Sequence, residues 1–493
     1  MITEDMDITV ESLKNKNVLV VGLARSGTGA ANLLSFFGAN VTVTDTRPQS
    51  SLEGEMKRLS QSVKAITGGN PEEAFTSADL IVVSPGVPMK ISPIVNAMKI
   101  GIPVIGELEL AYEIVKSYKS KVKSETPDFI GITGTNGKST TTTLIDLMLR
   151  ESGFHTMLGG NIGAALTEEI YKLASVAAGL SDIDLIVAEI SSFQLESIKY
   201  FRPKIALIMN ITPDHLDRYD TLNDYAEAKE RIYENQGEGD YLILNADDTL
   251  LKKIESEKLR SKQVKPDVLY FSLRDEVIGI YYKDGIIYYN LPSKLSDVLH
   301  PSIGEGRSQL ISVSKMKIKG THNLENAMAA SLTAILSGAS AEGVRNVLAD
   351  FTGLEHRNEV VRILNGITFI NDSKGTNVGA VEKSLENFES VILIMGGRDK
   401  GGDFSALRDL VKDKVKLLVL LGEAKEKIAD SLGDIVPIEY AKDMKSAVEL
   451  SVSRASEGDT VLLSPGCTSF DMFKDFEDRG RIFKEAVNAI RSS

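Results

Sequence analysis

The stretch Gly134-Thr135-Asn136-Gly137-Lys138-Ser139-Thr140 decides the fold class of this chain. It follows an apolar run, residues 129–132, and precedes a helix-like segment, residues 141–150. A strand, a glycine-rich loop and a helix in this order form a phosphate-binding loop, whose N–H groups and helix N-terminus cradle phosphates. Lys138 supplies a cation, and the Ser139 hydroxyl is suited to ligate Mg²⁺. The stretch therefore predicts a site for ATP or a related nucleotide.

The loop departs from the strict phosphate-loop pattern at one position. Ile132 stands where the first glycine of GxxxxGK[ST] belongs. A glycine- and threonine-rich turn that only caps a helix is therefore the alternative interpretation. The Gly-Lys-Ser order between a strand and a helix favours the nucleotide site over this turn.

Composition limits the class of protein. The 493 residues are enough for roughly three domains of about 150 residues each. The apolar content of 42% can fill several cores, and the net charge of −13 argues against a general nucleic-acid or membrane-surface binder. The single cysteine, Cys467, cannot form an internal disulfide and fits a reducing compartment. Residues 1–16 lack the apolar core of a signal peptide, and no run of about 18 apolar residues occurs, so we expect a cytoplasmic protein.

Short apolar runs alternate with amphipathic stretches, which is typical of an α/β fold with parallel sheets. Between the later runs, Asp284-Gly285 predicts a β-hairpin with a two-residue turn, and residues 291–309 are expected to form a long loop. The lysine-rich residues 117–127 are expected to form a solvated connection. The runs fall into three sets: 17–22, 41–45 and 79–84; then 129–132, 184–189, 204–210 and 240–245; then 367–371, 390–396, 415–422 and 459–464.

A second glycine loop, residues 20–27, follows the first apolar run. Asp45 ends the next run, at the place of the ribose-binding acid of a dinucleotide fingerprint. Ala24 replaces the middle glycine that lets a pyrophosphate approach, so a different nucleotide is favoured over NAD or FAD. A plain Rossmann-type turn stays open as an alternative. Thr46 and Arg47 follow Asp45 and are suited to contact the base or phosphates of such a ligand.

Polar residues with metal-binding chemistry follow two runs of the second set. Glu189 ends one run, where a carboxylate can hold Mg²⁺ or cap a helix. His215 lies between two aspartates in a loop after another run, where it can ligate a metal, act in catalysis or be structural. Lys229 lies on the helix-like stretch 225–232, and this pattern by itself predicts a solvated face.

Three polar loops follow strands of the third set: residues 370–377, 396–402 and 464–469. The carboxyl ends of parallel strands meet at one rim of a sheet, where open sheets bind ligands. Lys374 and Lys400 in these loops suit a carboxylate-bearing substrate, with ordinary surface lysines as the alternative. Cys467 has no histidine nearby in sequence and is expected to be a small buried side chain.

Taken together, these motifs resemble the Mur ligases, which are ATP-dependent amino-acid ligases of peptidoglycan precursor synthesis. The resemblance covers nearly the whole chain in order: Gly134–Thr140, Glu189 with Ser191–Gln194, Asp214-His215, Ala228-Lys229, His322-Asn323 with Asn326, His356-Arg357 and Asn371–Lys374. The D-glutamate-adding branch of the family is indicated by Ser84–Val87, Gly353–Arg357, Asn371–Asn377 and Ser464–Phe476.

The resemblance implies three domains and a reaction. A Rossmann-like domain that binds a UDP-sugar would occupy residues 1–107, a central P-loop-type ATPase sheet residues 108–353, and a Rossmann-like amino-acid-binding domain residues 354–493. The implied reaction joins D-glutamate to UDP-N-acetylmuramoyl-L-alanine through an acyl phosphate, with ATP and Mg²⁺. The implied enzyme would be a monomer without nucleic-acid or membrane partners.

The resemblance also implies roles at the matching positions. The sugar nucleotide would be held by Ala24, Arg25, Ser26, Thr46, Arg47, Ser84, Gly86 and Asn161. ATP would be bound by Gly134, Thr135, Asn136, Gly137, Lys138, Ser139, Thr140, Asn323, Asn326, Arg357 and Asp372. Metals would be served by Ser139, Glu189, His215 and Lys229, and the D-glutamate pocket lined by Lys374, Thr376, Lys400, Ser469 and Phe476. The catalytic set would be Lys138, His215, Lys229 and Lys374, with Lys229 carried as a carbamate, which overrides its solvated-face interpretation.

Two other functions are compatible with parts of the sequence. A sister ligase, adding another amino acid or extending folate with glutamate, shares the central loop, but residues 464–476 and the first glycine loop argue against it. A nucleotide-binding regulator without ligase activity would need neither a second metal nor an acceptor pocket. It is disfavoured by the joint presence of Glu189, His215, Lys229 and Lys374.

Overall fold

The computed structural model describes residues 8–122, 126–176, 179–215, 218–259, 265–295, 297–304, 306–399 and 401–490. The chain divides into two compact units, Met1–Phe351 and Thr352–Ser493. Unit 1 holds two sheets and unit 2 holds one, so the predicted α/β class with three sheet-containing regions is confirmed. The three predicted domain boundaries stay a prediction. No helix among the described residues is both long and apolar enough to cross a membrane.

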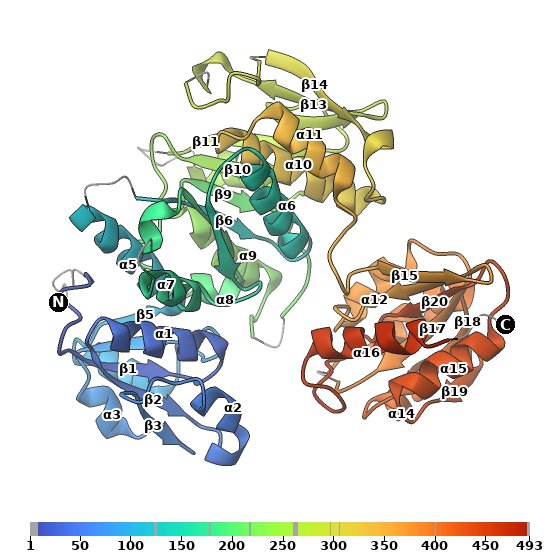
Figure 1. The fold of residues 1–493 in the computed structure, drawn as a ribbon, viewed down its shortest axis with the longest axis horizontal. Coiled ribbons are helices and arrows are strands. Elements are labelled where there is room, and N and C mark those ends of the chain that lie inside the picture. Colours follow the sequence, from blue (N-terminus) through green and yellow to red (C-terminus); the bar gives the residue numbers. More distant parts are fainter. Residues whose placement is uncertain are drawn as a thin grey trace. The chain divides into compact units, whose positions relative to one another are not determined.

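The first sheet of unit 1 is parallel and has the strand order β3-β2-β1-β4-β5 (Figure 1). The three central strands have almost fully buried side chains, which explains their apolar sequences. The two edge strands are short, and β3 is half exposed, so neither stood out in the sequence. The elements are β1 Asn17–Val21, α1 Arg25–Phe36, β2 Asn40–Asp45, α2 Glu53–Met56, β3 Lys64–Thr67, α3 Glu72–Thr76, β4 Leu80–Val83, α4 Ser92–Lys99, β5 Val104–Gly106 and α5 Glu107–Val122.

The central sheet of unit 1 has nine strands in the order β14-β13-β12-β11-β10-β9-β6-β8-β7. Strand β6 lies between β8 and β9, and it leads through the glycine loop into α6, which packs against α10. The elements are β6 Asp128–Thr133, α6 Lys138–Glu151, β7 Thr156–Gly160, α7 Leu166–Ala174, β8 Leu185–Glu189, α8 Ser192–Leu195, β9 Ile205–Ile208, α9 Leu222–Glu230, β10 Tyr241–Asn245, β11 Asp267–Ser272, β12 Gly279–Lys283, β13 Ile286–Leu291, β14 Gly306–Ser312, α10 Thr321–Leu336 and α11 Ala341–Asp350.

The hairpin expected at Asp284-Gly285 is confirmed. Strands β12 and β13 pair antiparallel with Lys283 opposite Ile286, and both turn residues have positive φ, 48° and 79°, as a type I′ turn requires. The expectation of a loop over residues 291–309 is wrong in its last part, because β14 begins at Gly306 and pairs with β13. Its first four residues alternate between partly and largely exposed, and only Leu310 and Ile311 are buried, so they form no continuous apolar run.

The lysine-rich stretch is only partly a connection. Helix α5 continues through Val122, so the first residues of the stretch are helical, and the Ser117 side chain is buried. Residues 123–125 lie outside the described residues. The polar composition indicated solvent exposure, but an amphipathic helix carries such residues on its outer face.

Unit 2 has one sheet, with the order β15-β16-β20-β17-β18-β19 and only β15 antiparallel to its neighbour. The four predicted strands are the central ones, which are buried between helices. The edge strands β15 and β19 were not expected. The elements are β15 Glu359–Leu364, β16 Ile367–Asn371, α12 Val378–Leu385, β17 Val391–Gly396, α13 Arg408–Lys414, β18 Val415–Leu421, α14 Lys425–Leu432, β19 Ile438–Tyr440, α15 Met444–Arg454, β20 Thr460–Leu463 and α16 Phe476–Asn488.

Candidate active site

The glycine loop between β6 and α6 has the shape of an anion cradle. Gly134 and Gly137 have φ values of 145° and 83°, which L side chains rarely adopt. The Lys138 ammonium folds back over the loop and donates hydrogen bonds to the carbonyl oxygens of Gly134 (2.8 Å) and Thr135 (2.9 Å). The Asn210 side-chain oxygen accepts the Asn136 N–H at 2.9 Å and braces the loop from the end of β9. The loop therefore carries a cation and oriented N–H groups at the start of a 14-residue helix.

Two predicted nucleotide-binding residues on α10 lie against this loop. Asn326 is buried, and its side-chain oxygen accepts a hydrogen bond from Thr141 Oγ1 at 3.4 Å. Its amide nitrogen donates to Asn323 Oδ1 at 3.4 Å. Asn323 and Asn326 are thus brought to the loop from a helix that begins almost 190 residues later in the sequence.

Replacing Gly137 by alanine should strain the backbone and, in addition, weaken nucleotide binding. A methyl group at Gly137 would collide with the Asn326 side-chain oxygen, in addition to the strain of a positive φ. Gly153 is the matched control, because its φ is 94° and a methyl group there meets nothing within 4 Å. We expect both variants to lose about 1–2 kcal/mol of stability, and only Gly137→Ala to lose affinity for a non-hydrolysable ATP analogue. Thermal unfolding measures the stability of both variants, and calorimetric titration measures their affinity for the analogue. Equal losses of affinity in the two variants would contradict the prediction.

Glu189 ends β8 beside the glycine loop strand and is 2% exposed. Its Oε1 accepts a hydrogen bond from Asn161 Nδ2 at 2.7 Å. Its Oε2 is buried and has no hydrogen-bond partner among the described residues. A buried carboxylate oxygen without a donor is costly unless something positive binds it. Glu189 therefore fits a Mg²⁺ ligand better than the helix-capping role, which Ser191 performs for α8.

His215 lies in the loop after β9 with a φ of 54°, and its side chain is 44% exposed. Its ring makes an edge-on contact with Phe193, with centroids 4.8 Å apart, and lies 6.1 Å from Tyr225. Its Nε2 is 3.7 Å from Asp214 Oδ2, which can orient the ring. The histidine is therefore held by aromatic neighbours while it stays accessible to a ligand.

Lys229 is not on a solvated face, and the prediction from its helix pattern is wrong. The side chain is 1% exposed, its Nζ donates to the Gly134 carbonyl oxygen at 2.9 Å, and it lies 4.5 Å from the Tyr225 ring centroid. Burial, and then the nearby Lys138 cation, hold the pKa of Lys229 well below its usual range. Helix α9 buries this face because it packs behind the glycine loop, which a local pattern cannot show. The outcome is a buried amine beside the phosphate cradle, whose surroundings favour the uncharged form.

These groups fit a Mg²⁺ site only if further oxygens complete it. No set of three or more His, Cys, Asp or Glu side chains among the described residues is arranged to hold a metal by itself. Mg²⁺ commonly combines one or two protein ligands with water and phosphate oxygens. The orphan Glu189 oxygen, the His215 ring and the Ser139 hydroxyl at the start of α6 are suitable for such a shared site.

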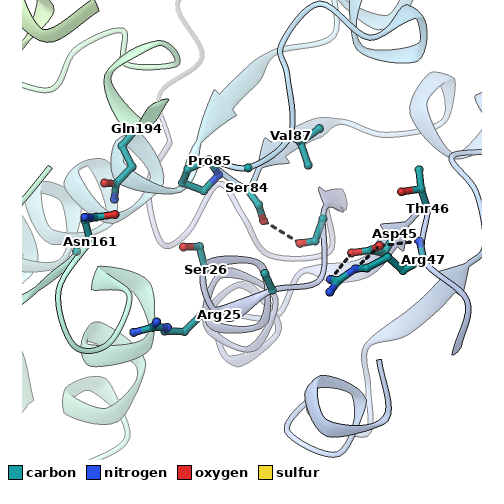
Figure 2. Close-up of a pocket in the computed structure, with 14 residues that line it drawn as sticks. Arg25, Ser26, Asp45, Thr46, Arg47, Ser84, Pro85, Val87, Asn161 and Gln194 are labelled. Carbon is teal, nitrogen blue, oxygen red and sulfur yellow. Dashed lines mark hydrogen bonds and ion pairs between the residues drawn. The ribbon is translucent and has the colours of Figure 1, made fainter. Parts of the chain in front are cut away.

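Unit 1 also contains a pocket of about 470 Å³ where the first and central sheets meet (Figure 2). Asp45, Thr46 and Arg47 lie at one end of it, and Asn161 and Gln194 at the other. It is lined by all eight residues predicted for the sugar nucleotide: Ala24, Arg25, Ser26, Thr46, Arg47, Ser84, Gly86 and Asn161. Their assembly was expected from the resemblance, whereas Gln194 was quoted there without a role.

Asp45 is not free for the ribose role of a dinucleotide fingerprint. Its two oxygens accept hydrogen bonds from Arg47 Nε (3.0 Å), Arg47 Nη2 (2.8 Å) and the Leu23 N–H (2.8 Å). Burial by itself would raise the pKa of Asp45, but the bonds from Arg47 and the Leu23 amide lower it. Asp45 thus fixes Arg47 across the first glycine loop, and Arg47 also donates to the Leu23 carbonyl oxygen at 2.7 Å.

Arg218 connects the histidine loop to the pocket and was missed in the sequence. It pairs with Glu196 through Nη2 and Oε2 at 2.6 Å and stacks on Phe193 at 4.1 Å from the ring centroid. Its Nη1 donates to the Pro85 carbonyl oxygen at 3.2 Å, and Pro85 lines the pocket. No local signal marks Arg218, because its partners come from two distant segments, α8 with its C-terminal residue and the loop after β4.

In unit 2, the predicted loops do meet at the carboxyl ends of the strands. Gly466 N–H donates to the Gly375 carbonyl oxygen at 2.8 Å, which joins the loop after β20 to the loop after β16. The Lys374 ammonium lies 3.8 Å from the Phe476 ring centroid. Thr376 and the buried Ser469 lie in these same two loops. Lys400 lies outside the described residues.

Arg479 holds these loops together and was also missed. It is 1% exposed, and its guanidinium donates to Ser373 Oγ (2.9 Å), the Ser373 carbonyl (2.8 Å) and the Cys467 carbonyl (3.1 Å). Burial lowers its pKa to about 10. Cys467 is buried as expected, and burial raises the pKa of its thiol to about 12, which suits an inert side chain.

Asp372 gives unit 2 a stability that depends on pH. Its side chain is buried, with Ser464 Oγ donating at 2.8 Å and the Asn358 N–H at 3.3 Å, and Arg357 contributes a favourable charge. Burial outweighs these contacts and raises the pKa of Asp372 from 3.8 to about 6. The stability contributed by the protonated form is therefore fully present below pH 3.8 and is lost as the pH rises through about 6.

Asp372→Asn should remove this loss. We expect the variant to gain up to about 3 kcal/mol over the wild type between pH 4 and pH 7, since one pKa unit is worth 1.4 kcal/mol. Thermal unfolding of both proteins at several pH values measures the difference. Asp434→Asn is the control, because Asp434 is exposed and its ion pair with Arg408 lowers its pKa, so it should show no such gain. A pH-independent difference for Asp372→Asn would refute the assignment.

Three family profiles match the chain in order. They are the Mur ligase MurD-like N-terminal domain over residues 16–106, the Mur ligase middle domain over 132–334, and the Mur ligase glutamate ligase domain over 356–467. The matched segments correspond to the three sheets.

Curated relatives match almost the full length. The UDP-N-acetylmuramoylalanine–D-glutamate ligase of Geobacter metallireducens is 42% identical over 97% of this chain and 98% of the relative. The ligase of the same name from Geotalea uraniireducens is 43% identical with the same coverage. Among solved structures, UDP-N-acetylmuramate-alanine ligase MurC from Thermotoga maritima has a TM-score of 0.53 at 18% identity, covering 96% of this chain and 99% of that one. MurF from Acinetobacter baumannii has a TM-score of 0.56 at 15% identity, covering 95% and 90%, so both support the fold.

Proposed function

This chain belongs to the Mur ligase family, and from this premise we infer that it joins D-glutamate to UDP-N-acetylmuramoyl-L-alanine in peptidoglycan precursor synthesis. The observation that carries the inference is the full-length likeness to ligases of that name. As a member of this family the chain uses ATP and Mg²⁺. The sister-ligase and regulator alternatives lose their support, because the relatives that are 42% and 43% identical over 97% of this chain are both named as D-glutamate ligases.

The reaction needs an activated carboxylate, since oxide is a poor leaving group. Transfer of the ATP γ-phosphoryl group to the alanyl carboxylate gives an acyl phosphate, from which phosphate leaves easily. The glycine loop, residues 134–140, is suited to hold the phosphates, and Lys138 to neutralise charge on the transferring oxygens. Asn323 and Asn326 are proposed to contact the nucleotide from α10. Arg357 and Asp372 are proposed as further ATP-binding residues.

The sugar nucleotide is proposed to occupy the pocket in unit 1. Arg47, fixed by Asp45, and Arg25 provide positive charge for a diphosphate, while Ser84 and Thr46 add hydroxyl groups. Asn161 and Gln194 close the end that lies near Glu189. In this orientation the sugar nucleotide would direct its alanyl carboxylate toward Glu189 and the other proposed metal ligands.

Mg²⁺, when bound, supplies positive charge that stabilises the phosphoryl oxygens during transfer. Glu189, His215 and Ser139 are proposed as its ligands. Lys229 is proposed to be carbamylated, because burial favours its uncharged amine, and an uncharged amine that bonds to CO₂ releases one proton and becomes a carbamate anion. Such a carbamate keeps one N–H for the Gly134 carbonyl oxygen and places its oxygens beside the cradle. It would supply the negative charge that the described carboxylates alone do not.

D-glutamate is proposed to bind in unit 2. Lys374 and Lys400 would fix its carboxylates, and Thr376, Ser469 and Phe476 would line its pocket. The neutral amine of D-glutamate attacks the acyl phosphate, and the positioning of its carboxylates supplies much of the rate. We further propose that the protein is a three-domain monomer that works in the cytoplasm, where ATP is available.

The deciding experiment measures phosphate release from Mg-ATP by the purified protein with UDP-N-acetylmuramoyl-L-alanine. D-glutamate is compared with L-glutamate, L-lysine and no amino acid, and the product is identified by mass spectrometry. A product of the expected mass with D-glutamate alone is the predicted result. Turnover with a different amino acid would move the acceptor assignment, and nucleotide binding without any product would refute the ligase function.

A further inference from the structure

Asn161 belongs to two neighbouring sites at once. It follows β7 and lines the pocket proposed for the sugar nucleotide (Figure 2). Its amide nitrogen also donates to Glu189 Oε1 at 2.7 Å. A carboxylate oxygen only accepts hydrogen bonds, so the amide nitrogen must face Glu189 and the amide oxygen must face away from it.

The backbone holds Asn161 rigidly in this place. Its N–H donates to the Glu189 carbonyl oxygen at 2.8 Å, which continues the pairing of β7 with β8. Gly160 precedes it with a φ of 102°, and a methyl group at Gly160 would collide with the same carbonyl. The main chain of Asn161 is thus fixed against β8, and from this position its side chain reaches Glu189.

Glu189 divides its two oxygens between Asn161 and an open position. Oε1 is occupied by Asn161, and the buried Oε2 has no partner among the described residues. The direction in which Oε2 points is set by the rotation of the carboxylate, and this rotation is set by the bond to Asn161. A ligand that bonds the Asn161 amide oxygen would hold the amide, and through it the carboxylate, in one orientation.

We propose that Asn161 is a positioning residue that couples the two sites, so that sugar-nucleotide binding tightens divalent-metal binding at Glu189. The proposal rests on the proposed function only for the identity of the pocket ligand. Because such coupling is an equilibrium property, it must be reciprocal: the metal tightens the sugar nucleotide by the same factor. Couplings of this kind are commonly about 5- to 150-fold.

The test uses Mn²⁺ as the metal probe, in the presence of a non-hydrolysable ATP analogue. Free Mn²⁺ is counted by electron paramagnetic resonance with and without UDP-N-acetylmuramoyl-L-alanine, and the sugar nucleotide is titrated calorimetrically with and without Mn²⁺. In the wild type we expect both affinities to rise by one common factor of about 5 or more. In Asn161→Ala we expect that factor to fall below about 2, as the link is removed.

Thr46→Ala is the matched control. Thr46 lines the opposite end of the same pocket, and no hydrogen bond joins it to Glu189. This variant should lower the affinity for the sugar nucleotide, while the coupling factor stays at the wild-type value. Melting temperatures of both variants verify that they are folded.

The outcomes separate the inference from the function on which it rests. Tight binding of both ligands to the wild type with no mutual effect would overturn the coupling and leave the ligase function standing. The same coupling factor in Asn161→Ala as in the wild type would also overturn it. Absence of sugar-nucleotide binding to the wild type would overturn both.

Discussion

Lys138→Ala is expected to lower kcat by about 10³-fold and to leave the melting temperature almost unchanged. The lysine is the cation of the glycine loop, and the charge that develops on the transferring phosphoryl group has no other fixed lysine donor on this loop. The lysine donates hydrogen bonds to two carbonyl oxygens of its own loop, which are local contacts outside the apolar core. Phosphate release under saturating substrates measures the rate.

The control for Lys138 is Lys172→Ala. Lys172 lies on α7 and is about half exposed, and its ion-pair partners among the described residues are Glu168 and Glu169 of the same helix. Such surface pairs are worth little, so activity and stability should both stay near wild type. If Lys138→Ala kept more than a tenth of the wild-type kcat, the loop would not be the phosphoryl-transfer site.

Lys229→Met is expected to lower kcat by about 10³-fold without lowering the free energy of unfolding. A buried amine is costly to keep, and methionine fills a similar volume without a polar group. The lowered pKa of Lys229 means that, between its folded and its ordinary pKa, the unfolded chain binds a proton there more strongly than the folded chain does. Stability contributed by this residue therefore rises with pH up to its ordinary pKa of about 10.4, and the methionine variant should lose that slope.

The carbamate itself is tested separately. Wild-type protein equilibrated with ¹³C-bicarbonate should show one protein-bound carbamate signal by NMR, and Lys229→Met should show none. Removal of CO₂ should lower the wild-type activity, and bicarbonate should restore it. A full rate in carefully CO₂-free buffer would exclude the carbamate and leave Lys229 as a structural neutral amine. Lys258→Met, which removes an exposed lysine paired with Glu230, should keep both signal and rate.

Whether a strand could be predicted from the sequence depends on how far its side chains are buried. Central parallel strands such as β6, β8 and β17 are covered on both faces, so they appear as apolar runs and were predicted. The edge strands β3, β5, β15 and β19 are short or half exposed and lack this mark. Strand β14 exists because β13 offers it an edge, which no local pattern can show.

The same distinction applies to the site. The glycine loop, the acid that ends β8 and the histidine loop were visible because their chemistry is local. Arg218 and Arg479 were not, since each is defined by partners from separate loops. Lys229 was misjudged from its helix, although its nearest acceptor, Gly134, is 95 residues earlier in the chain.

By itself, the sequence determined the α/β class, the phosphate cradle and the family, because these depend on the order of runs and on residues adjacent in the chain. The tertiary structure decided which of those residues are buried and which share a partner. It buried the amine of Lys229, which lowers its pKa, and left one buried oxygen of Glu189 without a hydrogen-bond partner. It also joined Glu189 to the substrate pocket through Asn161. Burial and hydrogen bonding arise from packing between distant segments, and for that reason they are properties of the fold.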